Sequence, residues 1–194
     1  MSNSTWLVVG LGNPGPDYAA NRHNVGQMVL DILADRISAS FKSHKANASV
    51  AEGRIGFGGP KVILAKPGTY MNNSGGPVAN LMKFYDVDVQ HVIVVHDDID
   101  LPFDTVRIKF GGGHGGQNGL RSTIQHIGAD FVRVRVGVGR PAGQKDPAVH
   151  VLEPFSKAER EVLPSLIADA SGAVESIVLE GLSAAQLRYH SPQQ

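Results

Sequence analysis

Short continuous apolar runs and longer amphipathic stretches follow each other along this chain. The runs Leu7–Val9, Val62–Leu64 and Val92–Val95 have the length of buried strands, and the last is expected to be a central strand covered on both faces. Residues 105–110 and 131–138 alternate between apolar and polar, which predicts strands with one wetter face.

The stretch from Ala48 to Lys66 holds two apolar runs divided by Gly58-Gly59-Pro60, a pattern that predicts a β-hairpin. Apolar residues at i, i+3, i+4 and i+7 predict a helix over residues 24–39 and another over residues 77–86. A third helix is expected at Gly119–Ile127.

From about residue 156 onward the pattern predicts helices only. Ser156 and Glu159 match a capping box, and Pro164 allows a bend or restart before an apolar-striped helix that runs to about Leu179. Residues 183–186 predict a short final helix.

Strands and helices intermingle without an internal repeat or a long linker. The fold class predicted is therefore α/β, as a single globular domain over residues 1–194 with a mixed twisted sheet and helices on both faces. A chain of 194 residues that is 42% hydrophobic can bury one sizeable core.

Composition narrows the chemistry. Cysteine is absent, which excludes disulfides, thiolate ligands and a cysteine nucleophile and fits a reducing compartment. Residues 1–6 lack a basic segment followed by an apolar one, and no run approaches about 18 uninterrupted apolar residues. We expect a soluble cytoplasmic protein with no membrane association.

The net charge of zero conceals an asymmetry. Residues 101–145 hold seven Lys or Arg against two Asp or Glu, a net of +5, whereas residues 146–180 hold two against seven, a net of −5. A local positive field attracts polyanions even when the whole protein is neutral. The alternative is a surface segregation of charge without function.

Three asparagines, Asn13, Asn72 and Asn118, lie in loops that follow apolar runs. In α/β sheets ligands dock where strands give way to loops, and an amide side chain donates to carbonyls and accepts from N–H groups. Converging asparagines would suit a peptide-like substrate.

His23 comes just before the first predicted helix, and Asp97 directly follows a buried strand. Both are therefore expected at the edge of the sheet, where the carboxylate would hold one imidazole nitrogen and leave the other as a general base. The competing interpretation is a structural histidine.

Two glycine-rich segments raise the hypothesis of a nucleotide- or phosphate-binding loop. Gly10–Gly15 fits G-x-G-x-x-G, but the helix begins only near Asn24, too late for a dinucleotide site. Residues 110–119 carry six glycines, so backbone amides there can approach a ligand closely, yet the Gly-Lys-Ser/Thr ending of a phosphate loop is missing. A flexible connection is the simpler alternative.

Other reaction types are disfavoured. Ser74 does not lie in G-x-S-x-G, so a serine nucleophile is not expected. A metal could be held by oxygen and nitrogen ligands, but these residues lack the paired helical spacing of a zinc enzyme: His23, His96, Asp97, Asp98 and His114. We predict no metal and no cofactor, and keep a metal-dependent hydrolase as an alternative.

Taken together, several motifs resemble those of bacterial-type peptidyl-tRNA hydrolases, in that family's order and over most of residues 6–180. The motifs are Gly10–Gly15, Tyr18, Arg22–Gly26, Lys66–Gly75, His96-Asp97 and Gly111–Gly119. The resemblance implies a single α/β domain that hydrolyses the ester between a peptide and the terminal ribose of tRNA and so releases tRNA for reuse in translation. We expect a monomer. A non-catalytic RNA-binding protein is the alternative from another class.

The resemblance also assigns roles by position. His23 matches the catalytic base, Asp97 its orienting carboxylate, and Asn13 a residue at the reacting ester. Substrate-binding positions are Tyr18, Tyr70, Met71, Asn72 and Asn118, and positions that meet tRNA are Arg107, Lys109, Arg135 and Lys145. Gln117 stands where many relatives have histidine, and Tyr70 where phenylalanine is frequent, so neither polar group receives a catalytic role.

Overall fold

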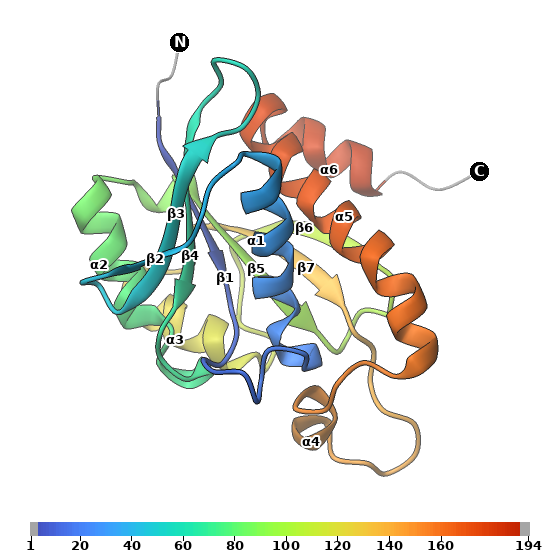
Figure 1. Cartoon of the computed structure of the whole chain (residues 1–194). Helices are drawn as coiled ribbons and strands as arrows, with labels where there is room; N and C mark the ends of the chain where they lie inside the picture. Colours follow the sequence, from blue (N-terminus) through green and yellow to red (C-terminus); the bar gives the residue numbers. More distant parts are fainter. Residues whose placement is uncertain (1–3, 191–194) are drawn as a thin grey trace.

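Seven strands form one mixed sheet in the order β2-β3-β4-β1-β5-β7-β6 (Figure 1). The computed structural model describes residues 4–190. Strand β1 pairs in parallel with β4 and β5, and β5 with β7, whereas the β2-β3, β3-β4 and β6-β7 pairs are antiparallel. The strands are β1 (Trp6–Gly10), β2 (Lys42–His44), β3 (Ala48–Arg54), β4 (Lys61–Pro67), β5 (Val92–Asp98), β6 (Val106–Phe110) and β7 (Val132–Gly137).

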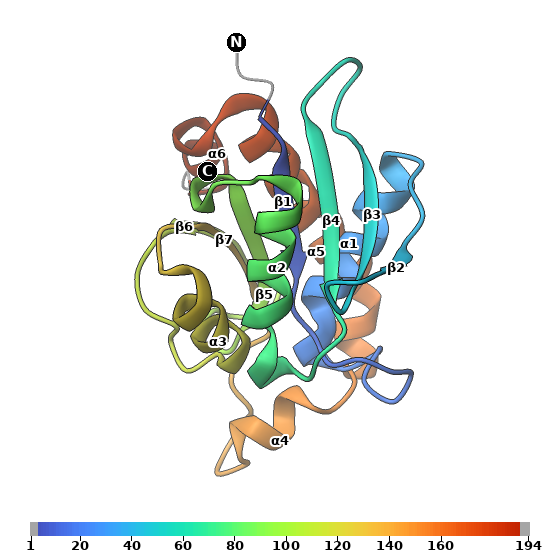
Figure 2. The ribbon, with the colours of Figure 1, turned by 90° about the vertical axis from the view of Figure 1, so that its left-hand side faces the viewer.

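Helices cover both faces of this sheet (Figure 2). One face carries α1 (Val25–Arg36), α5 (Lys157–Glu180) and α6 (Leu182–His190), and the other carries α2 (Gly75–Tyr85) and α3 (Asn118–Ile127). A short helix α4 (Pro147–Val151) lies past the carboxyl ends of β5 and β7 (Figure 1). The described residues also form three 3-10 turns: η1 (Arg22–Asn24), η2 (Met71–Asn73) and η3 (Val89–His91). The α/β class and the mixed sheet are as predicted.

The alternation along the central strands builds two cores. In β1, Val8 packs with the side chains of α1 and α5, whereas Leu7 and Val9 pack with those of α2 and α3. All three are fully buried, and so are Val92 to Val95 of β5. The prediction that this apolar run is a central strand covered on both faces is therefore confirmed.

Some helices begin or end at residues other than those predicted. Helix α1 ends at Arg36 rather than at residue 39, since Ser38 takes a left-handed conformation with φ of 55°. Helix α2 begins at Gly75, before Pro77, whose missing N–H costs nothing in the first turn. The β3–β4 hairpin lies where the pattern indicated, and α6 extends beyond residues 183–186.

Helix α5 does not restart at Pro164, because it continues through this residue from Lys157 to Glu180. One proline removes one backbone hydrogen bond, and here the burial of Leu166, Ala170 and Val174 against the core favours a continuous helix. Strand β2 and helix α4 were not predicted. The predicted domain limits include residues 1–3 and 191–194, which lie outside the described residues.

Helix α5 is both long and apolar. Its 24 residues, with a mean hydropathy of 1.5 in the most apolar window, would suffice to cross a membrane by length and composition alone. Core helices of globular proteins pass the same test. In this fold Ala173 and Ile177 of α5 are fully buried in the core that α1 shares.

Candidate active site

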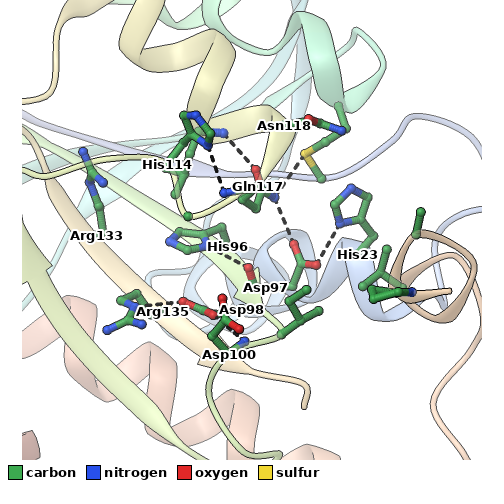
Figure 3. A pocket seen from close by; sticks show the side chains of 18 of the residues that line it. His23, His96, Asp97, Asp98, Asp100, His114, Gln117, Asn118, Arg133 and Arg135 are labelled. Atoms are coloured by element: carbon green, nitrogen blue, oxygen red, sulfur yellow. Dashed lines mark hydrogen bonds and ion pairs between the residues drawn. The ribbon is translucent and has the colours of Figure 1, made fainter. Parts of the chain in front are cut away.

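A cavity of about 500 Å³ lies at the carboxyl end of β5, between the loop that follows β1 and the loop that follows β4 (Figure 3). Its walls come from the loop after β1, the turns η1 and η2, the end of β5 and the residues after it, and strands β6 and β7. Residues 113–117, the start of α3 and helix α4 complete the lining. Among the predicted site residues it collects Asn13, His23, Met71, Asn72, Asp97, Lys109, Asn118 and Arg135. Residues distant in sequence thus share one hollow, as their places at the strand ends predicted.

Close backbone contacts bring the start of α1 to this cavity. A Cβ on Gly26 would lie 2.2 Å from the carbonyl oxygen of Val95, and a Cβ on Gly10 would lie 2.6 Å from that of Gly26. Only glycine permits such an approach between helix and strands. The first glycine of the G-x-G-x-x-G pattern therefore serves packing, and it lets the turn with His23 reach the end of β5.

His23 and Asp97 are joined by a hydrogen bond inside the cavity. The Nδ1 atom of His23 lies 2.8 Å from Oδ2 of Asp97, and the two side chains are 13% and 3% exposed. Because a carboxylate accepts, Nδ1 carries the hydrogen, and in the neutral ring Nε2 keeps its lone pair. That nitrogen is on the side of the ring turned away from Asp97 (Figure 3).

The pair alters the ionisation of the imidazole. Burial of His23 disfavours the charged ring, but the negative charge of Asp97 and its hydrogen bond outweigh that effect, so the pKa of His23 is raised above 6.5. The imidazolium is thus stabilised, which helps a base that must hold a proton during a reaction.

Gln117 completes the arrangement and was not among the predicted catalytic residues. Its Nε2 donates to Oδ1 of Asp97 at 3.0 Å, while its Oε1 accepts from the N–H of Leu120 at 2.8 Å and caps α3. Both carboxylate oxygens of Asp97 are therefore engaged. The cap was readable in the sequence as a polar residue before a helix, whereas the contact with Asp97 depends on the tertiary fold.

Asn13 is held in one orientation. Its backbone exchanges hydrogen bonds with the side chain of Asn24, at 3.0 and 2.9 Å, and its Oδ1 accepts from the N–H of Met71 at 2.7 Å. The amide oxygen is thereby used. Within residues 4–190 the Nδ2 group makes no hydrogen bond, so it remains a donor at the cavity wall.

The remaining predicted substrate-binding residues divide into two groups. Asn72 and Asn118 are exposed and line the cavity. Tyr18 and Tyr70 lie outside its lining and pack edge to face, with ring centroids 6.1 Å apart. Since Tyr70 directly precedes Met71, this aromatic pair lies beside the cavity rather than within it.

The basic residues form a row on strands β6 and β7. Arg107 is opposite Arg135, and Lys109 is opposite Arg133, so all four side chains share one face of the antiparallel pair. Arg135 also pairs with Asp98 at 2.8 Å. Lys145 is separate from this row and is paired with Glu153. Arg107 and Lys145 lie outside the cavity lining.

Arg133 differs from its neighbours because it is 1% exposed. Its guanidinium donates to the carbonyl oxygens of Gly112 and Gly113 and, at 3.2 Å, of Ala129. Arg133 lies on the face of β7 that was expected to be exposed to solvent, but the glycine-rich loop (residues 111–117) covers it. Gly112 in this loop has a left-handed backbone conformation.

His96 is buried beside the pair. Its Nδ1 donates to the carbonyl oxygen of Asp97 at 2.7 Å, and burial lowers its pKa, because the charged ring would lose its hydration. Its Nε2 has no partner within residues 4–190. In the same part of the chain no group of three or more His, Asp or Glu side chains could hold a metal ion.

Known proteins of one family match this chain over nearly its whole length. The family profile described as peptidyl-tRNA hydrolase matches residues 7–194. The peptidyl-tRNA hydrolase of Leifsonia xyli subsp. xyli is 64% identical over 96% of this chain and 97% of its own, and that of Arthrobacter sp. (strain FB24) is 61% identical over 96% and 97%. The crystal structure of peptidyl-tRNA hydrolase from Acinetobacter baumannii is 36% identical with a TM-score of 0.90, over 100% of this chain and 97% of that one. The chain belongs to the peptidyl-tRNA hydrolase family.

Proposed function

We propose that this protein hydrolyses the ester bond of peptidyl-tRNA by general-base catalysis, with His23 as the base. The observation that carries the proposal is the 2.8 Å contact between His23 Nδ1 and the buried Asp97, inside a cavity that asparagines also line. A held imidazole with one free nitrogen is what activation of water requires. Binding RNA alone would need no such pair.

The reaction follows from these groups. His23 Nε2 removes a proton from water as the water oxygen attacks the ester carbonyl, and Asp97 stabilises the resulting imidazolium. The Nδ2 group of Asn13 donates to the oxyanion that forms on the carbonyl oxygen. When the tetrahedral intermediate collapses, the bond to the ribose oxygen breaks, and His23 returns its proton to that oxygen.

The substrate's two halves would occupy different parts of the site. Met71, Asn72 and Asn118, with Tyr18 and Tyr70 beside the cavity, are proposed to contact the peptide. The amides of the two asparagines suit peptide N–H and carbonyl groups. The tRNA phosphates are proposed to lie along these basic side chains: Arg107, Lys109, Arg135 and Lys145. Support for this assignment is the continuity of Lys109 and Arg135 with the cavity wall.

The experiment is release of tRNA from a defined N-blocked aminoacyl-tRNA in the presence of chelator, with the unblocked form as comparison. We expect turnover in chelator, and a loss of about 10² to 10⁴-fold in His23→Ala. A His23→Ala protein that turned over at the parental rate would refute the base assignment. Activity lost in chelator and restored by added metal would favour a metal-dependent hydrolase, and tRNA binding without turnover a non-catalytic RNA-binding protein.

We also propose that the protein works as a cytoplasmic monomer, without cofactor or membrane. The absence of cysteine supports a reducing compartment. Light scattering of the purified protein with and without tRNA would test the monomer, and a dimer whose dissociation abolished activity would refute it.

A further inference from the structure

Arg22, which directly precedes His23, is an almost fully buried arginine at 6% exposure. Its Nη2 donates to Oε1 of Glu159 at 2.7 Å, and its Nη1 donates to the carbonyl oxygen of His150 at 2.9 Å. The guanidinium also lies 5.8 Å from the centre of the Phe155 ring. A buried charge with these partners fixes two pieces of backbone relative to each other.

All of these partners belong to one stretch, residues 147–159, which we call the wall segment. It comprises α4, the connection after it and the first residues of α5, and its residues Pro147, Ala148, Val151 and Leu152 line the cavity. The wall segment therefore faces the substrate on one side and holds Arg22 on the other.

The backbone of the turn is attached to the same segment. The N–H of Arg22 donates to the carbonyl oxygen of Glu153 at 3.1 Å, and Asn21 forms an isolated β-bridge with Pro154. On the other side of His23, Asn24 is locked to Asn13 by two hydrogen bonds. The imidazole is thus carried by a turn that is fastened at both neighbours, to the wall segment and to the Asn13 loop.

Glu159 strengthens this connection. Its Oε1 accepts from the N–H of Ser156 at 2.8 Å as part of the capping box of α5, and the same oxygen accepts from Arg22. The start of α5 and the turn with His23 therefore share one carboxylate. A displacement of the wall segment would reach the turn through this carboxylate and through the carbonyl of His150.

We propose that Arg22 is a positioning residue that couples the wall segment to the catalytic imidazole, so that contact of substrate with α4 holds His23 in register with Asp97. The inference rests on the proposed function, because Arg22 would affect the reaction only through the position of His23. The side chain of Arg22 does not line the cavity and does not reach the reacting atoms. Its effect is on geometry, and misplacement of a catalytic group by about 1 Å can cost about 10²-fold in rate.

The raised pKa of His23 provides a readout of this geometry. Asp97 is the charged group that raises it, and Arg22→Lys keeps the positive charge at position 22, so a change in this pKa reports on the distance between His23 and Asp97. If the imidazole moves away from Asp97 while it remains buried, the pKa of His23 must fall. A change in Arg22 that only weakened the fold would lower the melting temperature and leave that pKa unaltered.

The test compares Arg22→Lys and Arg22→Gln with Arg160→Gln as the matched control. Arg160 donates to the carbonyl of Phe155 at 2.7 Å in the same wall segment, but it does not contact the turn with His23. Lysine keeps the charge of Arg22 but cannot serve both Nη partners at once. NMR titration gives the pKa of His23, kinetics on an N-blocked aminoacyl-tRNA give kcat and KM, and thermal unfolding gives the melting temperature.

We expect Arg22→Lys to lower kcat by about 10 to 10²-fold and to lower the pKa of His23, with Arg22→Gln more severe and Arg160→Gln like the parent. Glu159→Gln, which keeps an acceptor for Ser156, should act like a milder Arg22→Lys and provides the test if Arg22→Gln does not fold. Parental kcat and His23 pKa in folded Arg22→Lys and Glu159→Gln would overturn the proposal. If His23→Ala were inactive in the same assay, that result would refute only the role of Arg22. If His23→Ala were active, the proposed function itself would be refuted.

Discussion

Gln117 and Asp97 are joined by a 3.0 Å hydrogen bond from the Nε2 of the amide to the carboxylate oxygen Oδ1, the one that His23 leaves free. A neutral donor therefore stabilises the charge of Asp97 without adding an ionisable group beside it. The same amide caps α3 through Leu120. The start of α3 and the catalytic pair thus share one side chain, which makes residue 117 a sensitive position.

We expect Gln117→Glu to raise the pKa of His23 further and to shift the pH profile of kcat/KM toward higher pH. The new carboxylate keeps an acceptor for the Leu120 N–H, but it adds a negative charge near the imidazole. Gln117→Ala, which removes donor and cap together, should lower kcat about 10-fold, equivalent to ~1.4 kcal/mol. A Gln117→Glu profile that coincides with that of the parent would contradict the contact.

The pH dependence of the parent follows from the pair itself. The base must be neutral, and the pKa of His23 is raised, so kcat/KM should rise with pH through a midpoint above 6.5. Asp97→Asn removes the charge that raises this pKa while burial remains, so the midpoint should move below 6.5. Its loss of rate should be smaller than that of His23→Ala, because the base is retained. Steady-state kinetics between pH 5 and about 9 measure both effects, and an unshifted midpoint in Asp97→Asn would speak against Asp97 as the source.

The basic row on β6 and β7 should govern affinity for tRNA rather than the chemical step. Arg107→Ala and Lys109→Ala are expected to raise KM for tRNA substrates and to flatten the dependence of log KM on log salt by about 0.7 to 0.9 for each phosphate that is no longer neutralised. Hydrolysis of a small ester should be unchanged. Lys61→Ala is the matched control, because Lys61 pairs with Glu52 on strands β4 and β3, away from the row. Salt dependence identical in all three variants would remove the role in phosphate binding.

His96 should give the folded state an opposite pH dependence from His23. Burial lowers the pKa of His96, so below about pH 6.5 the unfolded chain binds more protons at this residue, and its contribution to stability is lost as the pH falls. The pKa of His23 is raised, so its contribution is present below about pH 6.5 and is lost as the pH rises through the raised value. His96→Phe should therefore reduce acid sensitivity.

The measurement is the free energy of unfolding of the parent and of His96→Phe across that pH range. The variant loses the hydrogen bond to the Asp97 carbonyl, at a cost of about 1–3 kcal/mol near pH 7. This cost should shrink as the pH falls. A difference between the two proteins that stays constant with pH would show that His96 does not titrate with a lowered pKa.

The central strands and the long helices could be predicted from the sequence because local periodicity and tertiary burial agree there. Strand β2 could not be predicted, since its residues Lys42 to His44 are few, polar and mostly exposed, and only its pairing with β3 makes it a strand. Helix α4 had a readable signal in Asp146 followed by Pro147, an N-cap and a first-turn proline, but five residues are too short for apolar periodicity.

The candidate site divides in the same way. The asparagines, His23 and Asp97 follow from the rule that strand ends carry ligands, and they do meet in one cavity. The contacts of Gln117 and Arg22 required the packing of segments far apart in sequence, and the burial of Arg133 required the glycine-rich loop to fold over it. No local pattern encodes which carbonyl groups a guanidinium will meet.

The fastening of Gly112 and Gly113 by Arg133 divides the glycine-rich loop into two parts. The first part is anchored from below by a buried cation that has no other acceptors than these carbonyls and that of Ala129 within residues 4–190. The second part, Gly115 to Gln117, ends on Asp97. The loop is therefore anchored at both ends, by a buried guanidinium at its start and by a carboxylate at its end, so a change in its shape at constant anchoring is confined to the residues between Gly113 and Gln117.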